Sequence, residues 1–228
     1  MNANAGWPDA ILWDMDGTLI DTEPYWIAAE VELCDAHGAS WTHADGLTLV
    51  GNPLVTSAEV LRDRGVDLPV PAIIDALLAE VISLVNGFVP WQEDALRLLL
   101  RARERGIPCA LVTMSYASLA DAFIASAGSF EAVVTGDTVA QGKPHPESYL
   151  TAAAQLGVPI ERCLAIEDSP SGTRSAHASG ARTVGVRRLT PLDPLPGMSR
   201  VRSLDSLTDV AIEAIMAGVV FDELGDEV

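Results

Sequence analysis

Polar residues follow short aliphatic runs in this chain, at the points where the runs end. They are Asp14 with Asp16, Thr113, and Glu167 with Asp168. Lys143 stands in a loop after a further aliphatic run. In open parallel sheets, ligands bind beyond the carboxyl ends of the strands. We therefore expect these carboxylates, the hydroxyl and the lysine to converge on one crevice.

Clustered carboxylates repel one another unless they share protons or a cation neutralises them. Asp14 and Asp168 suit a hard divalent ion with oxygen ligands, and Mg²⁺ is the first expectation. A carboxylate such as Asp14 can attack phosphorus and form an acyl phosphate. Asp16, two residues further on, can give a proton to the leaving oxygen and later take one from water. Thr113 and Lys143 supply donors to the phosphoryl oxygens.

Basic residues are few, and nearly all of them are arginine. Of the 14 basic residues, 13 are arginine, and Lys143 is the only lysine in the chain. A surface lysine is the ordinary alternative, but the Gly-Lys-Pro setting of Lys143 favours a functional role. For Asp14 and Asp16 the alternative is a simple Asx-turn after a strand. For Thr113 the alternative is a cap on the following helix, and both roles are compatible.

The elements that must position these residues alternate from Trp91 onward. Predicted strands at 109–112, 132–134, 163–166 and 183–186 alternate with predicted helices at 94–105, 118–127, 147–156 and 171–179. Together with a first strand at 10–13, this pattern predicts a doubly wound, Rossmann-like parallel sheet in a three-layer α/β core. Residues 191–198 are expected to form a proline-rich loop and 205–216 a last helix.

A block without strand-like runs separates the first strand from the others. Helices are expected at 25–37, from about 52 to 64, and at 71–85. We therefore predict an all-helical cap domain at residues 22–90, inserted into a core formed by residues 1–21 and 91–228.

Composition narrows the classes of protein that remain. The 228 residues are 49% hydrophobic and 5% aromatic, so the core should be aliphatic. The formal net charge of -18 argues against nucleic acid and anionic membranes as partners. The three cysteines match no disulfide or metal pattern, which favours a reducing compartment. We find no signal peptide and no apolar run of transmembrane length, and expect a cytoplasmic monomer.

Four motifs resemble those of the haloacid dehalogenase superfamily and occur in the same order. The first is Asp14-Met15-Asp16-Gly17-Thr18-Leu19, and the second is Leu111-Val112-Thr113-Met114-Ser115. The third is Gly142-Lys143-Pro144-His145-Pro146-Glu147, and the fourth is Ile166-Glu167-Asp168-Ser169-Pro170-Ser171-Gly172. The resemblance covers essentially the whole chain, and four motifs in register are far more specific than one.

The resemblance implies a role for each motif residue. Asp14 would be the nucleophile and a Mg²⁺ ligand, and Asp16 the general acid and base whose main-chain carbonyl also binds the metal. Thr113 would hold the phosphoryl group, and Lys143 would bind it and orient Asp14. Asp168 would bind the metal directly, and Glu167 directly or through water. Further candidates for contact with the substrate are Gly17, Met114 and Ser115 in the core, and Gly51 and Asn52 in the cap.

Within the superfamily, the cap placement resembles the β-phosphoglucomutase and phosphatase branch. Dehalogenases lack the second aspartate, which is present here as Asp16. Phosphonoacetaldehyde hydrolases need a cap lysine, and this cap has none. β-Phosphoglucomutases carry a cap histidine where Trp26 stands and a cap arginine where Leu54 stands.

We therefore expect Mg²⁺-dependent hydrolysis of a small phosphorylated metabolite, such as a sugar phosphate or phosphoglycolate, through an aspartyl-phosphate. A phosphomutase remains the alternative enzyme. A binding module on a decayed phosphatase scaffold is the non-enzymatic alternative, but it would require a lost motif residue.

Overall fold

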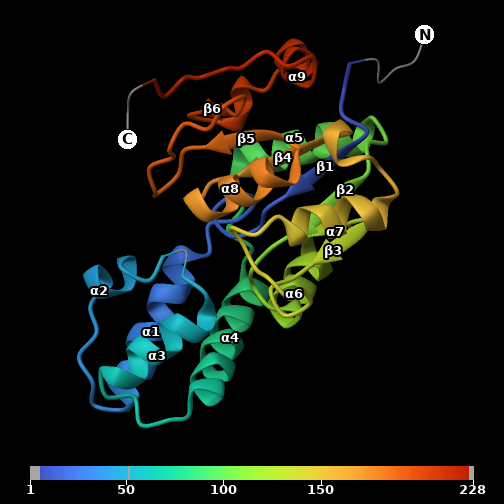
Figure 1. Cartoon of the computed structure of the whole chain (residues 1–228). Coiled ribbons are helices and arrows are strands. Elements are labelled where there is room, and N and C mark those ends of the chain that lie inside the picture. Colours follow the sequence, from blue (N-terminus) through green and yellow to red (C-terminus); the bar gives the residue numbers. More distant parts are fainter. Residues whose placement is uncertain (1–5, 51, 226–228) are drawn as a thin grey trace. The chain divides into compact units, whose positions relative to one another are not determined.

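The structure is a computed structural model that describes residues 6–50 and 52–225. Contacts within the chain define two compact units (Figure 1). The first contains the chain up to Ile20, Trp91–Met114 and the part from Ser129 onward, and the second contains Asp21–Pro90 and Ser115–Gly128. The division into a core and a cap with the expected boundaries remains a prediction.

The first unit is built on one parallel sheet. Its strands are β1 (Ala10–Trp13), β2 (Cys109–Val112), β3 (Ala132–Val134), β4 (Cys163–Glu167), β5 (Arg182–Val186) and β6 (Ser199–Val201). Their order is β3-β2-β1-β4-β5-β6, and all neighbouring pairs are parallel. The predicted Rossmann-like, doubly wound sheet is confirmed.

Helices cover the two faces of this sheet (Figure 1). Helices α7 (Glu147–Leu156) and α8 (Pro170–Ser179) pack on one face, and α5 (Glu93–Glu104) lies on the other. Ala10 and Leu12 belong to the apolar cluster beneath α7 and α8. Every residue of β1 is buried, so burial on both faces explains why the strand is a continuous apolar run without alternation.

The C-terminal part of the first unit differs from the prediction in two places. Strand β6 was not predicted, because Ser199-Arg200-Val201 contains no apolar run. It pairs with β5 on one side, and on the other Arg200 N–H donates to the Phe221 carbonyl at 2.7 Å. The last helix, α9, begins at Asp209 and not at residue 205, because Thr208 caps it and Leu204–Ser206 form a separate 3-10 turn.

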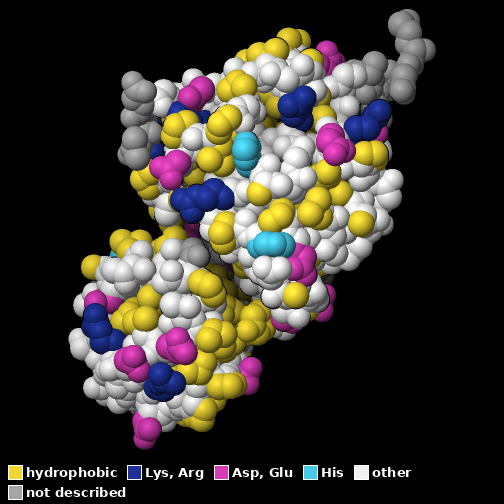
Figure 2. Space-filling view, in the orientation of Figure 1, with side chains coloured by type: hydrophobic (Ala, Val, Ile, Leu, Met, Phe, Trp, Pro, Cys, Tyr) yellow, Lys and Arg dark blue, Asp and Glu magenta, His cyan; other side chains and the backbone are white. Residues whose placement is uncertain are grey.

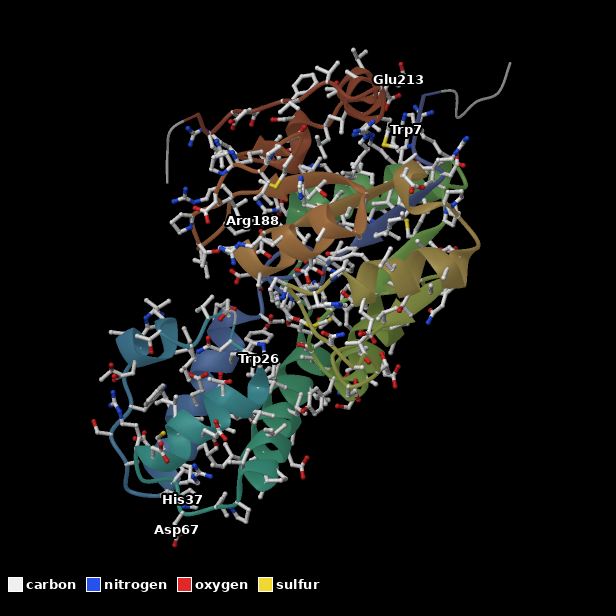
Figure 3. All side chains as sticks on the ribbon, viewed as in Figure 1. Trp7, Trp26, His37, Asp67, Arg188 and Glu213 are labelled. Atoms are coloured by element: carbon white, nitrogen blue, oxygen red, sulfur yellow. The ribbon has the colours of Figure 1, made fainter. Side chains whose placement is uncertain are left out.

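A buried ion pair anchors the loop that follows β5. Arg188, labelled in Figure 3, donates to Asp94 Oδ1 at 2.6 Å and to Oδ2 at 3.2 Å. Asp94 also accepts from Ser203 Oγ and from the main-chain N–H of Leu204, both at 2.9 Å. One carboxylate near the start of α5 thus fixes two segments of the chain beyond β5.

Within its described residues, the second unit has helices and no strands. They are α1 (Glu23–Ala36), α2 (His43–Leu47), α3 (Leu54–Asp63), α4 (Val70–Gly87) and α6 (Ala117–Ala127). Helix α4 packs against α1, α3 and α6 through an apolar stripe of Ile73, Ile74, Leu77, Leu78, Val81 and Val85. Helix α2 was not predicted, although Thr42 and Asp45 form a capping box at its start.

The expectation that no apolar segment reaches transmembrane length was wrong for α4. By length and composition alone, its 18 residues are long and apolar enough to cross a membrane. The helix nevertheless carries Asp75 and Glu80, and its buried stripe packs on three other helices. A core helix of a folded domain has these same properties, so the segment is weak evidence for a membrane span.

The surface shows no dominant cationic area on the face drawn in Figure 2. Acidic and basic side chains are interspersed there among apolar ones. With a net charge of -18, such a surface has no evident attraction for a polyanion.

Candidate active site

The sheet order brings three of the motifs to one edge. Strand β1 lies between β2 and β4, so Asp14, Thr113 and Glu167 end adjacent parallel strands. The main-chain N–H of Asp14 donates to the Ile166 carbonyl at 3.1 Å, which continues the β1–β4 ladder up to the nucleophile candidate. The arrangement follows directly from adjacent strands that run in the same direction.

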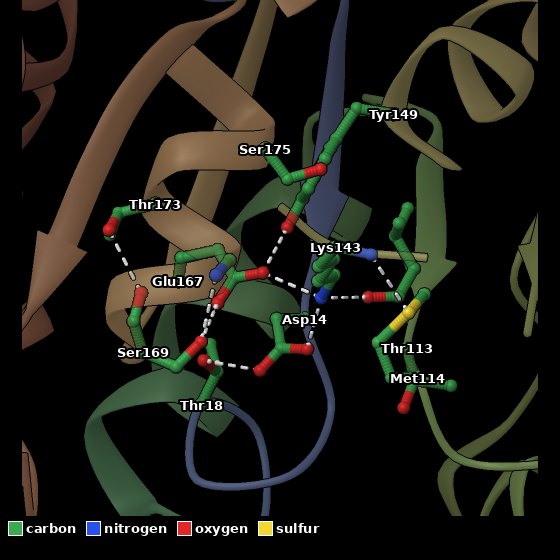
Figure 4. A network of polar contacts seen from close by, with 12 residues as sticks. Asp14, Thr18, Thr113, Met114, Lys143, Tyr149, Glu167, Ser169, Thr173 and Ser175 are labelled. Carbon is green, nitrogen blue, oxygen red and sulfur yellow. Dashed lines mark hydrogen bonds and ion pairs between the residues drawn. The ribbon is translucent and has the colours of Figure 1, made fainter. Parts of the chain in front are cut away.

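Lys143 lies at the centre of these groups (Figure 4). Its Nζ is 2.7 Å from Asp14 Oδ1, 2.6 Å from Glu167 Oε1 and 2.9 Å from the Val112 carbonyl. The Lys143 side chain is 3% exposed, so water contributes little to solvating its charge. The only lysine of the chain is therefore a buried cation held by two carboxylates and one carbonyl.

The loop that carries Lys143 is held from several sides. Glu147 accepts from the main-chain N–H groups of Ala140 at 2.8 Å and Gln141 at 3.0 Å. Ser175 Oγ, on α8, donates to the His145 carbonyl at 2.6 Å. The main-chain N–H of Lys143 donates to Met114 Sδ at 3.2 Å. These contacts restrict the path of the loop, and so the reach of the Lys143 side chain.

Thr18 connects the first and fourth motifs. Its Oγ1 is 2.9 Å from Asp14 Oδ2 and 3.0 Å from Asp168 Oδ1. Because a hydroxyl carries one proton, Thr18 donates to one of these carboxylates at a time. Gly17 makes the close approach possible, since its φ is +83° and a Cβ there would lie 2.2 Å from Asp168 Oδ2. Gly17 is thus required by the backbone turn, and its contact with substrate remains a prediction.

The carboxyl groups perturb one another. Burial, followed by repulsion from Glu167, raises the pKa of Asp14 to about 6, although Lys143 and Thr18 oppose the shift. Burial, followed by repulsion from Asp14 and Glu167, raises the pKa of Asp168 well above its usual value. Burial opposes the charge of Lys143, but attraction to Asp14 and Glu167 outweighs it and raises the pKa of Lys143. If Asp14, Glu167 and Asp168 were all ionised, their negative charge would exceed what the single lysine neutralises, and the raised pKa values of Asp14 and Asp168 express that cost together with burial.

This donor set fits a hard divalent cation. Asp14, Glu167 and Asp168 each offer a carboxylate oxygen, and these oxygens lie within 4.8 Å of one another. Carboxylate oxygens are the ligands that Mg²⁺ and Ca²⁺ prefer in proteins. A bound dication would also offset the repulsion that raises the pKa values of Asp14 and Asp168.

Asp16 and Thr113 contact each other beside this cluster. Thr113 Oγ1 donates to Asp16 Oδ2 at 3.0 Å, and Thr113 is fully buried. Met114 follows Thr113 in the chain. Its carbonyl oxygen lies so close to Gly136 that a Cβ on that glycine would be 2.1 Å from this oxygen. The second motif thus lies against both the first motif and the loop after β3.

The remaining substrate-binding candidates belong to the second unit. Ser115 is buried, and Asn52 is exposed. Gly51 lies outside the described residues. Contact of Ser115, Asn52 or Gly51 with a substrate remains a prediction.

Three polar residues of the cluster were not singled out from the sequence. They are Thr18, Tyr149 and Ser169. Tyr149, on α7, donates its hydroxyl to Glu167 Oε1 at 2.6 Å, and Ser169 Oγ donates to Glu167 Oε2 at 3.3 Å. Thr18 and Ser169 stand within the quoted motifs, so their positions were a usable signal. Tyr149 was detectable only as a bulky polar residue in an otherwise alanine-rich helix.

Comparison with known proteins agrees with this geometry. Residues 8–180 match the family model described as haloacid dehalogenase-like hydrolase. The chain belongs to this family. The predicted superfamily and the prediction of an enzyme are both confirmed.

Similar proteins include phosphatases, which supports the predicted β-phosphoglucomutase- and phosphatase-like branch. It is 33% identical to protein CbbY of Rhodobacter capsulatus, over 80% of this chain and 85% of that protein. It is 30% identical to the fructose-1-phosphate phosphatase YqaB of Escherichia coli, over 78% of this chain and 96% of that protein. Among solved structures, CbbY from Rhodobacter sphaeroides in complex with phosphate matches with a TM-score of 0.79 and 28% identity. The match covers 88% of this chain and 96% of that one.

Proposed function

We propose that this haloacid dehalogenase-like hydrolase releases phosphate from a small phosphate monoester through an aspartyl-phosphate at Asp14. The observation that carries the proposal is the contact of Asp14 with both Lys143 and Thr18. Oδ1 accepts from Lys143 and Oδ2 lies 2.9 Å from the Thr18 hydroxyl, so the carboxylate has a set orientation at the edge of the sheet. A carboxylate held in this way is a nucleophile ready for attack on phosphorus.

Two steps complete the reaction. An oxygen of Asp14 attacks phosphorus, the bond to the substrate oxygen breaks, and Asp16 gives that oxygen a proton. Water then attacks the aspartyl-phosphate while Asp16 takes its proton, which releases inorganic phosphate and restores Asp14. Lys143 and Thr113 donate to the phosphoryl oxygens, where negative charge is stabilised during the transfer.

Asp14 and Asp168, with the Asp16 main-chain carbonyl and with Glu167 directly or through water, would hold Mg²⁺. The bound ion would neutralise charge on the phosphoryl group and reduce its repulsion by the carboxylates. The support is the carboxylate oxygens that lie within 4.8 Å of one another and the raised pKa values of Asp14 and Asp168.

The relatives support a proposal for the substrate class. The names of similar proteins include a fructose-1-phosphate phosphatase and hexitol phosphatases, and a CbbY mutant was crystallised with xylulose-1,5-bisphosphate. We propose a sugar phosphate as substrate and the helical unit as a cap that selects it, with Gly51, Asn52 and Ser115 as contacts. The half-buried Trp26, near the start of α1 in Figure 3, stands where a mutase would carry histidine.

A cytoplasmic location and a monomeric state complete the proposal. The described cysteines, Cys34, Cys109 and Cys163, are all free and buried. Free, buried thiols are typical of proteins in a reducing compartment.

The test is phosphate release from a panel of sugar phosphates, with Mg²⁺ and with chelator. Wild type and Asp14→Asn would be compared at equal fold content, measured by circular dichroism. We expect Mg²⁺-dependent release by wild type and none above background by the variant. Conversion of β-glucose 1-phosphate to an isomer without phosphate release would instead indicate a mutase. No reaction in a folded, Mg²⁺-binding protein would contradict the enzyme proposal.

A further inference from the structure

The hydroxyl of Tyr149 is a buried donor at the back of the candidate site. Tyr149 is fully buried on α7, and its hydroxyl lies 2.6 Å from Glu167 Oε1 (Figure 4). The phenol hydroxyl carries a proton and the carboxylate oxygen accepts, so Tyr149 donates to Glu167.

The same carboxylate oxygen binds the lysine. Glu167 Oε1 is 2.6 Å from Lys143 Nζ as well as from the Tyr149 hydroxyl. Glu167 Oε2 accepts from Ser169, and a Cβ on Gly172 would lie 1.9 Å from Oε2. Donors and close packing thus leave this side chain little freedom to rotate, and its Oε1 points at the lysine.

Tyr149 also contacts the lysine itself. Lys143 Nζ lies 5.3 Å from the centroid of the Tyr149 ring, within the range of a cation–π interaction. Tyr149 therefore contacts both members of the Glu167–Lys143 ion pair. Its helix, α7, carries none of the residues proposed to bind the phosphoryl group.

We propose that Tyr149 is a positioning residue that holds Glu167 against Lys143, so that Glu167 serves mainly the phosphoryl-binding lysine and only secondarily the metal. This inference rests on the proposed function, because it assigns a purpose to the lysine of that site. It predicts that loss of the Tyr149 hydroxyl disturbs Lys143 and leaves metal binding intact.

The chain offers a direct readout, because Lys143 is its only lysine. Protein labelled with ¹³C-lysine gives one side-chain Cε signal, which reports the surroundings of Lys143 whether or not a substrate is known. We compare wild type and Tyr149→Phe by this signal, by calorimetric titration with Mg²⁺, and by kcat and KM on the best substrate of the panel.

For Tyr149→Phe we expect a displaced Lys143 signal and a kcat lowered about tenfold, the effect of one hydrogen bond to a charged group. The Kd for Mg²⁺ should stay within about twofold of wild type. Tyr25→Phe is the matched control, since it removes a tyrosine hydroxyl that donates to the Phe88 carbonyl at 3.0 Å. The control should leave the signal and kcat unchanged.

A second variant tests the connection between the two residues. In a Glu167→Gln background, Tyr149→Phe should add little further loss of kcat, because both changes disrupt one unit. Fully additive losses would overturn the proposal. An unmoved Lys143 signal with unchanged kcat would also overturn it, and so would Mg²⁺ binding weakened tenfold with the signal in place. If wild type releases no phosphate, the proposed function fails, while the Lys143 signal still tests the contact.

Discussion

Two buried glutamates, one in each unit, differ in what surrounds them. Glu167 ends β4 and is fully buried among Lys143, Tyr149 and Ser169. Glu30, on α1, is 4% exposed, and its carboxylate accepts a hydrogen bond from Trp41 Nε1 at 3.0 Å.

The difference shows why burial alone does not identify a catalytic carboxylate. Burial raises the pKa of Glu30 to about 7, and the bond from Trp41 only partly opposes this. Glu30 can be buried as a neutral acid and then needs no cation. Glu167 instead forms an ion pair with a buried lysine, and it lies beside two more carboxylates. The cation beside the carboxylate distinguishes the candidate site from an ordinary buried acid.

Removing that cation should have the largest effect. Lys143→Met leaves Asp14 and Glu167 buried without their shared partner. We expect phosphate release to fall about 10²–10³-fold and the free energy of unfolding at pH 8 to fall by about 3–5 kcal/mol. Urea denaturation and the release assay measure the two effects.

Arg64 of the helical unit provides the control for this prediction. It lies over Trp41 at 5.3 Å and pairs with Asp45 at 3.3 Å, with half of its side chain exposed. Arg64→Met should cost about 1 kcal/mol or less. Equal losses of stability for the two variants would contradict the contrast between the units.

Adding one methyl group beside each glutamate should sharpen the comparison. In Gly172→Ala the new Cβ would lie 1.9 Å from Glu167 Oε2, and the donors around Glu167 prevent an easy retreat. We expect a loss of about 1–3 kcal/mol in the free energy of unfolding and a clear loss of kcat.

In Gly46→Ala the nearest atoms are Ile27 Cγ1 at 2.9 Å and Glu30 Oε2 at 3.0 Å, so the new Cβ meets much milder overlap than in Gly172→Ala. The cost should be below about 1 kcal/mol, since alanine also favours the helix. Chemical denaturation of both variants measures this difference, and a larger loss for Gly46→Ala would reverse the expected ranking.

Glu30 should make the stability of wild type depend on pH. Its pKa in the native state is about 7 against an ordinary 4.5, so between these values the native state binds more protons than the unfolded state. The free energy of unfolding therefore falls as pH rises from 4.5 through 7, by at most about 3 kcal/mol from this group.

Glu30→Gln should remove this slope and leave phosphate release at saturating substrate near the wild-type value. Urea denaturation between pH 5 and pH 8 gives the difference between the two proteins, in which the other titrating groups cancel. Parallel stability profiles would show that Glu30 is already charged in the native state.

Much of the core could be predicted because its signals are local. The aliphatic runs 10–13, 109–112, 132–134, 163–166 and 183–186 all form strands, since burial on both faces demands continuous apolar residues. Asp14 directly follows the first run, and Glu167 and Asp168 follow the run 163–166, so chain order alone brings them to the carboxyl edge of the sheet. Strand β6 escaped prediction because its pairing depends on β5 and on residues near Phe221.

The sequence by itself determined the parallel sheet, the helical block and the set of residue types at one edge. Only the tertiary structure decided how those side chains pair. Lys143 and Asp14 are 129 positions apart in the sequence, and Tyr149 and Glu167 are 18 positions apart. Periodicity and propensity are properties of neighbouring residues, whereas these contacts depend on how α7, β1 and β4 pack in three dimensions. Tertiary packing therefore decides which oxygen of Glu167 faces the lysine, and the local sequence around Glu167 does not.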